Sequence, residues 1–258
     1  MRIDQLLVER GLAASRSQAQ RLIAGGVKWQ QPDGAWRTVV KNRDEVPESA
    51  ALQLLDDAES RYVSRGGLKL EGALKATGVQ VDGLRCLDVG HAQVHPRISQ
   101  DERVVCIEGV NARELEPGDE RIPDALEGFD LVVGDVSFIS LTLVLPGVVH
   151  LLKPTGQLLM LVKPQFELQP GQVGKGGIVK DDTHFPFIEN RVRTALTDLG
   201  LQVTAWLDSP IAGGDGNHEF FVQACWPNPD AVLPAREKTR VAHEADLAAK
   251  AYAKANDY

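Results

Sequence analysis

Two ionisable side chains follow two apolar runs that are close together in the chain. Asp135 comes just past the run 129–133, and Lys163 comes directly after the run 156–162. Each run has the character of a buried strand, and ligands of open α/β sheets bind at the carboxyl ends of the strands. A carboxylate and an amine at this edge form a candidate proton-transfer site. Taken singly, each has an ordinary alternative, a turn-forming aspartate and a surface lysine.

The elements that must position this pair follow an alternating pattern. Further strands are expected at 84–90, 104–107, 201–206 and 219–224, with helical patterns between them, such as 188–199. Alternating strands and helices predict an α/β fold with a doubly wound, mostly parallel sheet.

Composition sets the broad class of the protein. The 258 residues are 43% hydrophobic and 25% charged, which is ordinary for a globular chain. No apolar run approaches the roughly 18 residues that span a bilayer, and the first residues predict an amphipathic helix instead of a signal peptide. The three cysteines, Cys86, Cys106 and Cys225, have no metal-ligand spacing. We therefore expect no metal site, no membrane partner, a cytoplasmic location and cysteines that are small buried residues.

The charge is distributed unevenly along the chain. The net charge is −8, yet the first 43 residues carry eight Lys and Arg against three Asp and Glu. Helices are expected at 3–12 and 16–24, the second capped by Ser15, followed by a hairpin of two strands. A basic module attached to an acidic body suggests that the amino end binds a phosphate backbone.

This basic module resembles the small RNA-binding domain of ribosomal protein S4. The resemblance is carried by RIDQLL at 2–7, GLAASRSQA at 11–19 and IAGGV at 23–27. It implies ribosomal RNA or ribosomal subunits as the partner. The candidate RNA-binding residues are Arg2, Arg16, Arg21 and Lys28. The alternative is a solvated basic helical hairpin without a partner.

Five further blocks resemble the TlyA family across essentially the whole chain. They are SRGGLKL at 64–70, CLDVG at 86–90, GDVSFIS at 134–140, VKPQFE at 162–167 and GNHEFF at 216–221. Members of this family are ribosomal RNA 2′-O-methyltransferases, also described as haemolysins, with a catalytic domain related to FtsJ. The resemblance implies methylation of a cytidine ribose with S-adenosylmethionine (SAM) as the methyl donor.

The family's catalytic residues match Lys69, Asp135, Lys163 and Glu219 in this chain. A ribose hydroxyl must lose its proton as it attacks a methyl group. A lysine serves as the base only when its pKa is depressed, which burial and a second ammonium group would achieve. The resemblance thus implies that Lys163 is the base and Lys69 its charged neighbour. Asp135 would orient the base, and Glu219 would hold the second lysine or the ribose.

The donor site departs from the family pattern. A SAM fold needs a glycine-rich turn after the first strand, a helix, and a second strand that ends in an acid. Here Asp88-Val89-Gly90 runs directly into His91, as though most of one βαβ unit were missing. The strand at 104–107 is expected to take the vacant position and present Glu108 to the ribose. The candidate donor-binding residues are Asp88, Gly90, Glu108, Asn111 and Asp135, and we expect SAM binding to be weakened or lost.

The predicted organisation is an S4-like domain at 1–57, a linker at 58–64 and an FtsJ-like methyltransferase domain at 65–258. The glycine-rich segment 171–178 lacks the spacing of a nucleotide-binding P-loop, and we interpret it as a lid or an RNA-contacting loop. The tail 235–258 is expected to be helical. A catalytically inactive RNA-binding remnant of the family is the alternative function. A pore-forming haemolysin finds no support, because no membrane-length stretch is present.

Overall fold

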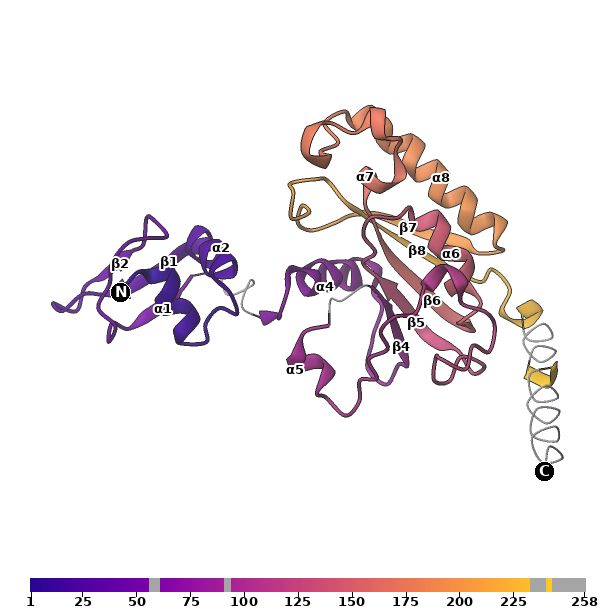
Figure 1. The fold of residues 1–258 in the computed structure, drawn as a ribbon, viewed down its shortest axis with the longest axis horizontal. Helices are drawn as coiled ribbons and strands as arrows, with labels where there is room; N and C mark the ends of the chain where they lie inside the picture. The colour runs from indigo at the N-terminus through magenta and orange to yellow at the C-terminus, as the bar shows by residue number, and fades with distance from the viewer. Residues whose placement is uncertain (56–60, 91–93, 233–239, 243–258) are drawn as a thin grey trace, which may run out of the picture. The chain divides into compact units, whose positions relative to one another are not determined.

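The chain forms two compact units, Met1–Glu71 and Gly72–Tyr258, in a computed structural model (Figure 1). The structure describes residues 1–55, 61–90, 94–232 and 240–242. The predicted linker falls partly outside the described residues, and the predicted helical tail falls mostly outside them. The predicted domain bounds stay predictions.

The first unit is a helical hairpin packed on a small antiparallel sheet. Ser15 begins the second helix as expected, because its hydroxyl oxygen accepts a hydrogen bond from the Gln18 amide at 3.2 Å. The apolar sides of both helices form the core, with Ile3 and Leu22 almost fully buried. The elements are α1 (Ile3–Glu9), α2 (Arg16–Gly26), β1 (Val27–Gln30), β2 (Trp36–Thr38) and β3 (Leu52–Leu54), with the sheet order β2-β1-β3.

The second unit contains a five-stranded sheet among the described residues. The strands are β4 (Cys86–Val89), β5 (Phe129–Gly134), β6 (Leu152–Val162), β7 (Gln202–Asp208) and β8 (Phe220–Cys225), in the order β4-β5-β6-β8-β7. β4, β5 and β6 are parallel, and β8 runs antiparallel to both β6 and β7. This is the mostly parallel α/β sheet that the sequence predicts. β5, β6 and β8 are largely buried and lie between other strands.

Two helices cover one face of this sheet. They are α6 (Leu141–Val149) and α8 (Phe185–Asp198), whose buried side chains join those of β5, β6 and β8 in one core (Figure 1). α4 (Arg65–Thr77) begins in the first unit and ends in the second. The shorter helices are α5 (Pro96–Ser99), α7 (Pro164–Glu167), η1 (Ala112–Glu114), η2 (Pro170–Gln172), η3 (Lys175–Gly177) and η4 (Asp182–His184).

The expected strand at 104–107 does not form. This segment has no regular structure, and Val105 and Ile107 are exposed. The chain continues into η1, which packs against α6, where a Cβ added to Gly147 would lie 2.0 Å from the Ala112 carbonyl oxygen. Because α6 holds the following residues, β4 is the edge strand of the described sheet.

The same edge position corrects the expectation for the cysteines. Cys86 in β4 and Cys106 in the irregular segment are exposed, and Cys225 is half-buried. A cysteine on an edge strand has a neighbouring strand on one side only, and a cysteine on a segment that joins no sheet has none.

Candidate active site

β5 delivers Asp135 to the carboxyl edge of the sheet. Gly134 ends the strand where β4, β5 and β6 approach most closely, because a Cβ there would lie 2.9 Å from the Val89 carbonyl oxygen and 2.5 Å from the Met160 methyl carbon. The Asp135 amide donates to the Val89 oxygen at 3.1 Å. The backbone of Asp135 is therefore fixed by its hydrogen bond to the end of β4.

β6 delivers Lys163 to the same edge. Its side chain is 11% exposed, and its Nζ forms an ion pair with Asp135 Oδ1. The Nζ also donates to the Ser137 hydroxyl oxygen at 2.7 Å. The structure thus brings together the carboxylate and the amine that the sequence singles out, and it adds a hydroxyl that the sequence analysis missed.

Glu219 lies beside Lys163 through the pairing of β6 with β8. Val162 pairs with Phe220, so the next residues beyond the paired ends, Lys163 and Glu219, are neighbours in the antiparallel register. Glu219 is 3% exposed. A Cβ on Gly213 would lie 2.6 Å from Glu219 Oε1, which explains the glycine at that position.

Lys69 lies in α4, within the first compact unit, and is buried. The structure therefore brings Asp135, Lys163 and Glu219 together within the second unit. The catalytic role of all four residues stays a prediction.

The pKa of Asp88 in β4 is raised by its surroundings, which include the charge of Asp135. Loss of solvation raises the pKa of Asp88, and the negative charge of Asp135 raises it further. The Asp88 and Val133 positions pair in the parallel ladder, which places Asp88 one residue before the end of its strand. Asp88 is thus the expected donor-site residue that the structure places near Asp135.

The other expected donor-site residues are not arranged as a SAM site requires. Glu108 does not end a strand, because the segment before it is irregular. Asn111 instead caps η1: its Oδ1 accepts from the Arg113 amide at 3.2 Å, and its Nδ2 donates to Glu114 Oε1 at 2.8 Å. Gly90 follows the edge strand directly. SAM usually binds between a first and a second parallel strand, and among the described residues no strand pairs with β4 on its outer side.

The glycine-rich segment, expected to be a lid or an RNA-contacting loop, is joined to the loop that precedes Glu219 and β8. Gly176 and Gly177 have φ of +77° and +80°, values that favour glycine. Asn217 is 1% exposed; its Oδ1 accepts from the Val179 amide at 2.9 Å and its Nδ2 donates to the Gly177 oxygen at 2.9 Å. One end of the segment is thus fixed two residues from Glu219, and the lid interpretation stays a prediction.

Phe138 is a further residue that sequence reasoning missed. Its side chain is 92% exposed beside the Lys163–Ser137 contact, and its φ of +64° is unusual for a residue other than glycine. Its ring centroid lies 5.4 Å from that of Phe166. The sequence signal was an aromatic residue inside a polar loop that follows a buried strand.

The described residues contain neither a helix that could cross a membrane nor a group of three or more His, Cys, Asp and Glu side chains that could hold a metal ion.

Comparison with known proteins finds a match in each of the two units. Residues 84–225 match the FtsJ-like methyltransferase family, and residues 1–26 match the S4 domain. A TlyA 16S/23S rRNA (cytidine-2′-O)-methyltransferase from Mycobacterium tuberculosis is 37% identical and covers 95% of this chain and 96% of its own length. The chain belongs to the TlyA family. The family includes SAM-dependent RNA methyltransferases. This is the enzyme class that the five sequence blocks indicate.

Two further relatives carry the haemolysin name. Hemolysin A from Brachyspira hyodysenteriae is 31% identical and covers 86% of this chain and 98% of its own length. A solved structure of a protein described as a hemolysin from Streptococcus thermophilus has a TM-score of 0.62 and 30% identity, and covers 96% of this chain and 98% of that chain.

One of these alignments is longer than this chain. The M. tuberculosis alignment runs over 277 residues, more than the 258 residues of this chain. That TlyA protein therefore contains residues for which this chain has no counterpart.

Proposed function

We propose that this chain acts on ribosomal RNA and retains the hydroxyl-activating half of a ribose 2′-O-methyltransferase site, with strongly reduced affinity for SAM. The observation that carries the proposal is the contact of Lys163 Nζ with both Asp135 and Ser137 at the carboxyl edge of the sheet. The cytidine specificity is taken from the activity named for the TlyA relative.

Lys163 is proposed as the base. In its uncharged form the Lys163 amine could donate its two N–H groups to Asp135 and Ser137 and take the proton of a ribose 2′-hydroxyl on its lone pair, leaving the ribose oxygen as the nucleophile that attacks the donor methyl group. Asp135 and Ser137 fix the direction of the Nζ. The neighbouring Glu219 is proposed to hold the second lysine or the ribose. Lys69 is proposed to supply the second positive charge. Correct placement of the hydroxyl relative to the methyl donor then supplies much of the rate enhancement.

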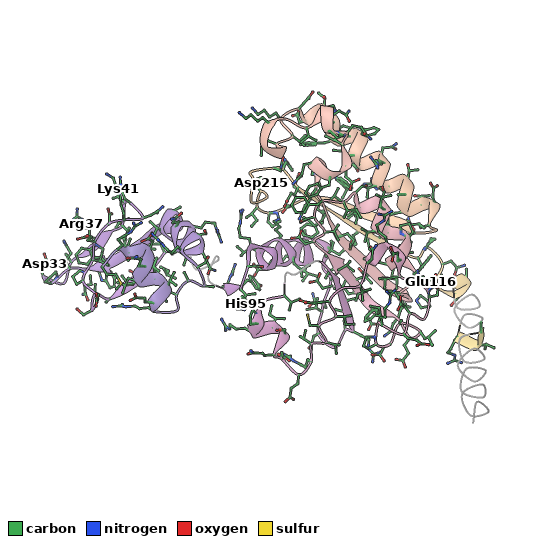
Figure 2. The ribbon with its side chains drawn as sticks, in the orientation of Figure 1. Asp33, Arg37, Lys41, His95, Glu116 and Asp215 are labelled. Atoms are coloured by element: carbon green, nitrogen blue, oxygen red, sulfur yellow. The ribbon has the colours of Figure 1, made fainter. Side chains whose placement is uncertain are left out.

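The first unit is proposed to bind the RNA backbone. Arg2 and Arg16 both pair with the fully buried Asp4, at 2.8 and 3.1 Å, yet their side chains remain 40% and 53% exposed. Asp4 therefore fixes the direction of two guanidinium groups that can still reach phosphates. Arg37 and Lys41 extend from the surface of the same unit (Figure 2). Together with Arg21 and Lys28, these cations are suited to a salt-sensitive RNA contact.

The cytoplasmic location of the protein stays a prediction.

The reduced SAM affinity is supported by the edge position of β4. No described strand pairs with the outer side of β4, so Glu108 does not end a strand there, and Asn111 instead caps η1. The same observation favours a second function, RNA binding without methyl transfer.

Two measurements test these proposals. Isothermal titration with SAM is expected to show binding much weaker than micromolar, and micromolar affinity would contradict the reduced donor site. Radiolabelled SAM at high concentration is then supplied to ribosomal subunits that lack the 2′-O-methyl group.

Label in the RNA that is lost with Lys163→Ala but kept with Lys153→Ala would support methyl transfer. Lys153 is a matched control, because it lies on the same strand and pairs with Asp130 at 2.8 Å. RNA binding without any label would favour the binding-only function.

A further inference from the structure

A buried carboxylate lies next to the Asp135–Lys163 pair and has no part in the proposed chemistry. Glu167 ends α7 and is 1% exposed. Its Oε2 accepts from the Ser140 hydroxyl at 2.6 Å, and its Oε1 accepts from the Leu141 amide at 2.6 Å. Ser140 and Leu141 are the residues at which α6 begins. Glu167 thus joins the loop after β6 to the start of the helix after β5.

Arg191 of α8 also contacts Glu167. It donates from a terminal guanidinium nitrogen to the Glu167 carbonyl oxygen at 2.7 Å, and its Nε lies 3.9 Å from the Glu167 carboxylate. A buried carboxylate is costly unless it is hydrogen-bonded and paired. Here each carboxylate oxygen has a donor at 2.6 Å, so the group forms a defined link and not a surface ion pair.

The link belongs to a row of contacts between two loops. Lys163 directly precedes α7, and Phe166 and Glu167 are the last two residues of α7. Lys163 contacts Asp135 and Ser137, Phe166 contacts Phe138, and Glu167 contacts Ser140 and Leu141. The order of contacts along α7 follows the order of residues 135–141.

We propose that Glu167 is a positioning residue, which ties α7 to the start of α6 and thereby holds the Lys163 amine against Asp135 and Ser137. The role of the Lys163 amine as the catalytic base rests on the proposed function. The link itself can be measured without RNA or a methyl donor, so the two ideas can fail separately.

The test measures how fast each lysine amine is acetylated by a succinimidyl ester in the intact folded protein, with sites located by peptide mass spectrometry. Glu167→Ala removes both hydrogen bonds, and we expect Lys163 to react about tenfold faster, as local opening of one loop allows. Lys153, at the other end of β6 in its own ion pair with Asp130, is the internal control and should keep its rate within about twofold.

Two milder variants keep the test usable if Glu167→Ala does not fold. Ser140→Ala removes one of the two hydrogen bonds and should also accelerate Lys163 selectively. Glu167→Gln keeps an acceptor for the Leu141 amide and a polar group for Ser140, so Lys163 should stay within about threefold of its original rate.

Three results would overturn the proposal. An unchanged Lys163 rate in Glu167→Ala, or in Ser140→Ala if the former does not fold, would show that the link does not hold the amine. Equal acceleration of Lys163 and Lys153 would show a general loss of stability. Glu167→Gln reacting as fast as Glu167→Ala would show that the hydrogen bonds are not what holds α7.

Discussion

Asn217 connects the glycine-rich segment to the loop before Glu219, and replacing it with alanine should loosen that segment. The side chain is buried and makes two hydrogen bonds of 2.9 Å, from the Val179 amide and to the Gly177 carbonyl. Val179 is 8% exposed, so its amide would be left without an acceptor away from water.

The expected cost follows from these two bonds. An unsatisfied buried N–H costs about 1–3 kcal/mol, and the loss of an ordinary hydrogen bond costs about 1 kcal/mol. Asn217→Ala should therefore destabilise the segment by about 2–4 kcal/mol. Asn190→Ala makes the same chemical change at an exposed position of α8, and should alter stability by less than about 0.5 kcal/mol.

Tryptic cleavage after the exposed Lys175 reports the opening of this segment. Each 1.4 kcal/mol of local destabilisation raises the open population about tenfold, so Asn217→Ala should be cleaved at least about tenfold faster than Asn190→Ala. Urea unfolding of both variants shows whether the remaining fold is intact. Equal cleavage rates in two folded variants would refute the idea that Asn217 holds the segment.

Three further changes test other parts of the second unit. Burial raises the pKa of Glu167 above its ordinary 4.5, although its hydrogen bonds oppose this effect. The folded state thus binds this proton more tightly, so the stability of the natural protein relative to Glu167→Gln should be greatest at low pH and fall as the pH rises through the folded-state pKa. Urea unfolding at pH 5 and pH 8 should show this change, which amounts to about 1.4 kcal/mol for each tenfold difference in proton affinity between the folded and unfolded states. An equal difference in stability between the two proteins at both pH values would contradict it. Gly134→Ala should lower the free energy of unfolding by about 1–3 kcal/mol, because its Cβ would press on Met160 and the Val89 oxygen; an unchanged urea midpoint would count against this close approach. Phe138→Ala should weaken binding of a ribosomal RNA fragment about tenfold in a filter assay at fixed salt, because an exposed ring can stack on a base. Equal affinity would show that the ring does not contact RNA.

The strands that carry the candidate pair could be predicted from local sequence. The apolar runs before Asp135 and Lys163 are continuous because β5 and β6 are buried on both faces, and such runs are visible without a structure. The cap of α2 by Ser15 was equally local, since donor and acceptor are three residues apart.

The failure at 104–107 had a different cause. Its four apolar residues have the composition of a strand, but a strand also needs a partner and a connection that reaches it. Here η1 packs against Gly147 of α6, and the segment before it remains exposed. Whether a partner strand lies within reach of the segment is not written in the segment itself.

The sequence by itself determined the two apolar runs that become β5 and β6, and that an acid and an amine follow them, because a continuous apolar run is a local property of the chain. Only the tertiary structure decided what surrounds the pair. The Ser137 contact with Lys163, the Ser140 contact with Glu167 and the Asn217 contact with Val179 each join residues more than 25 positions apart. Such contacts depend on how two loops meet after the sheet has formed, and hydrogen bonds of that kind leave no periodic signal in the sequence.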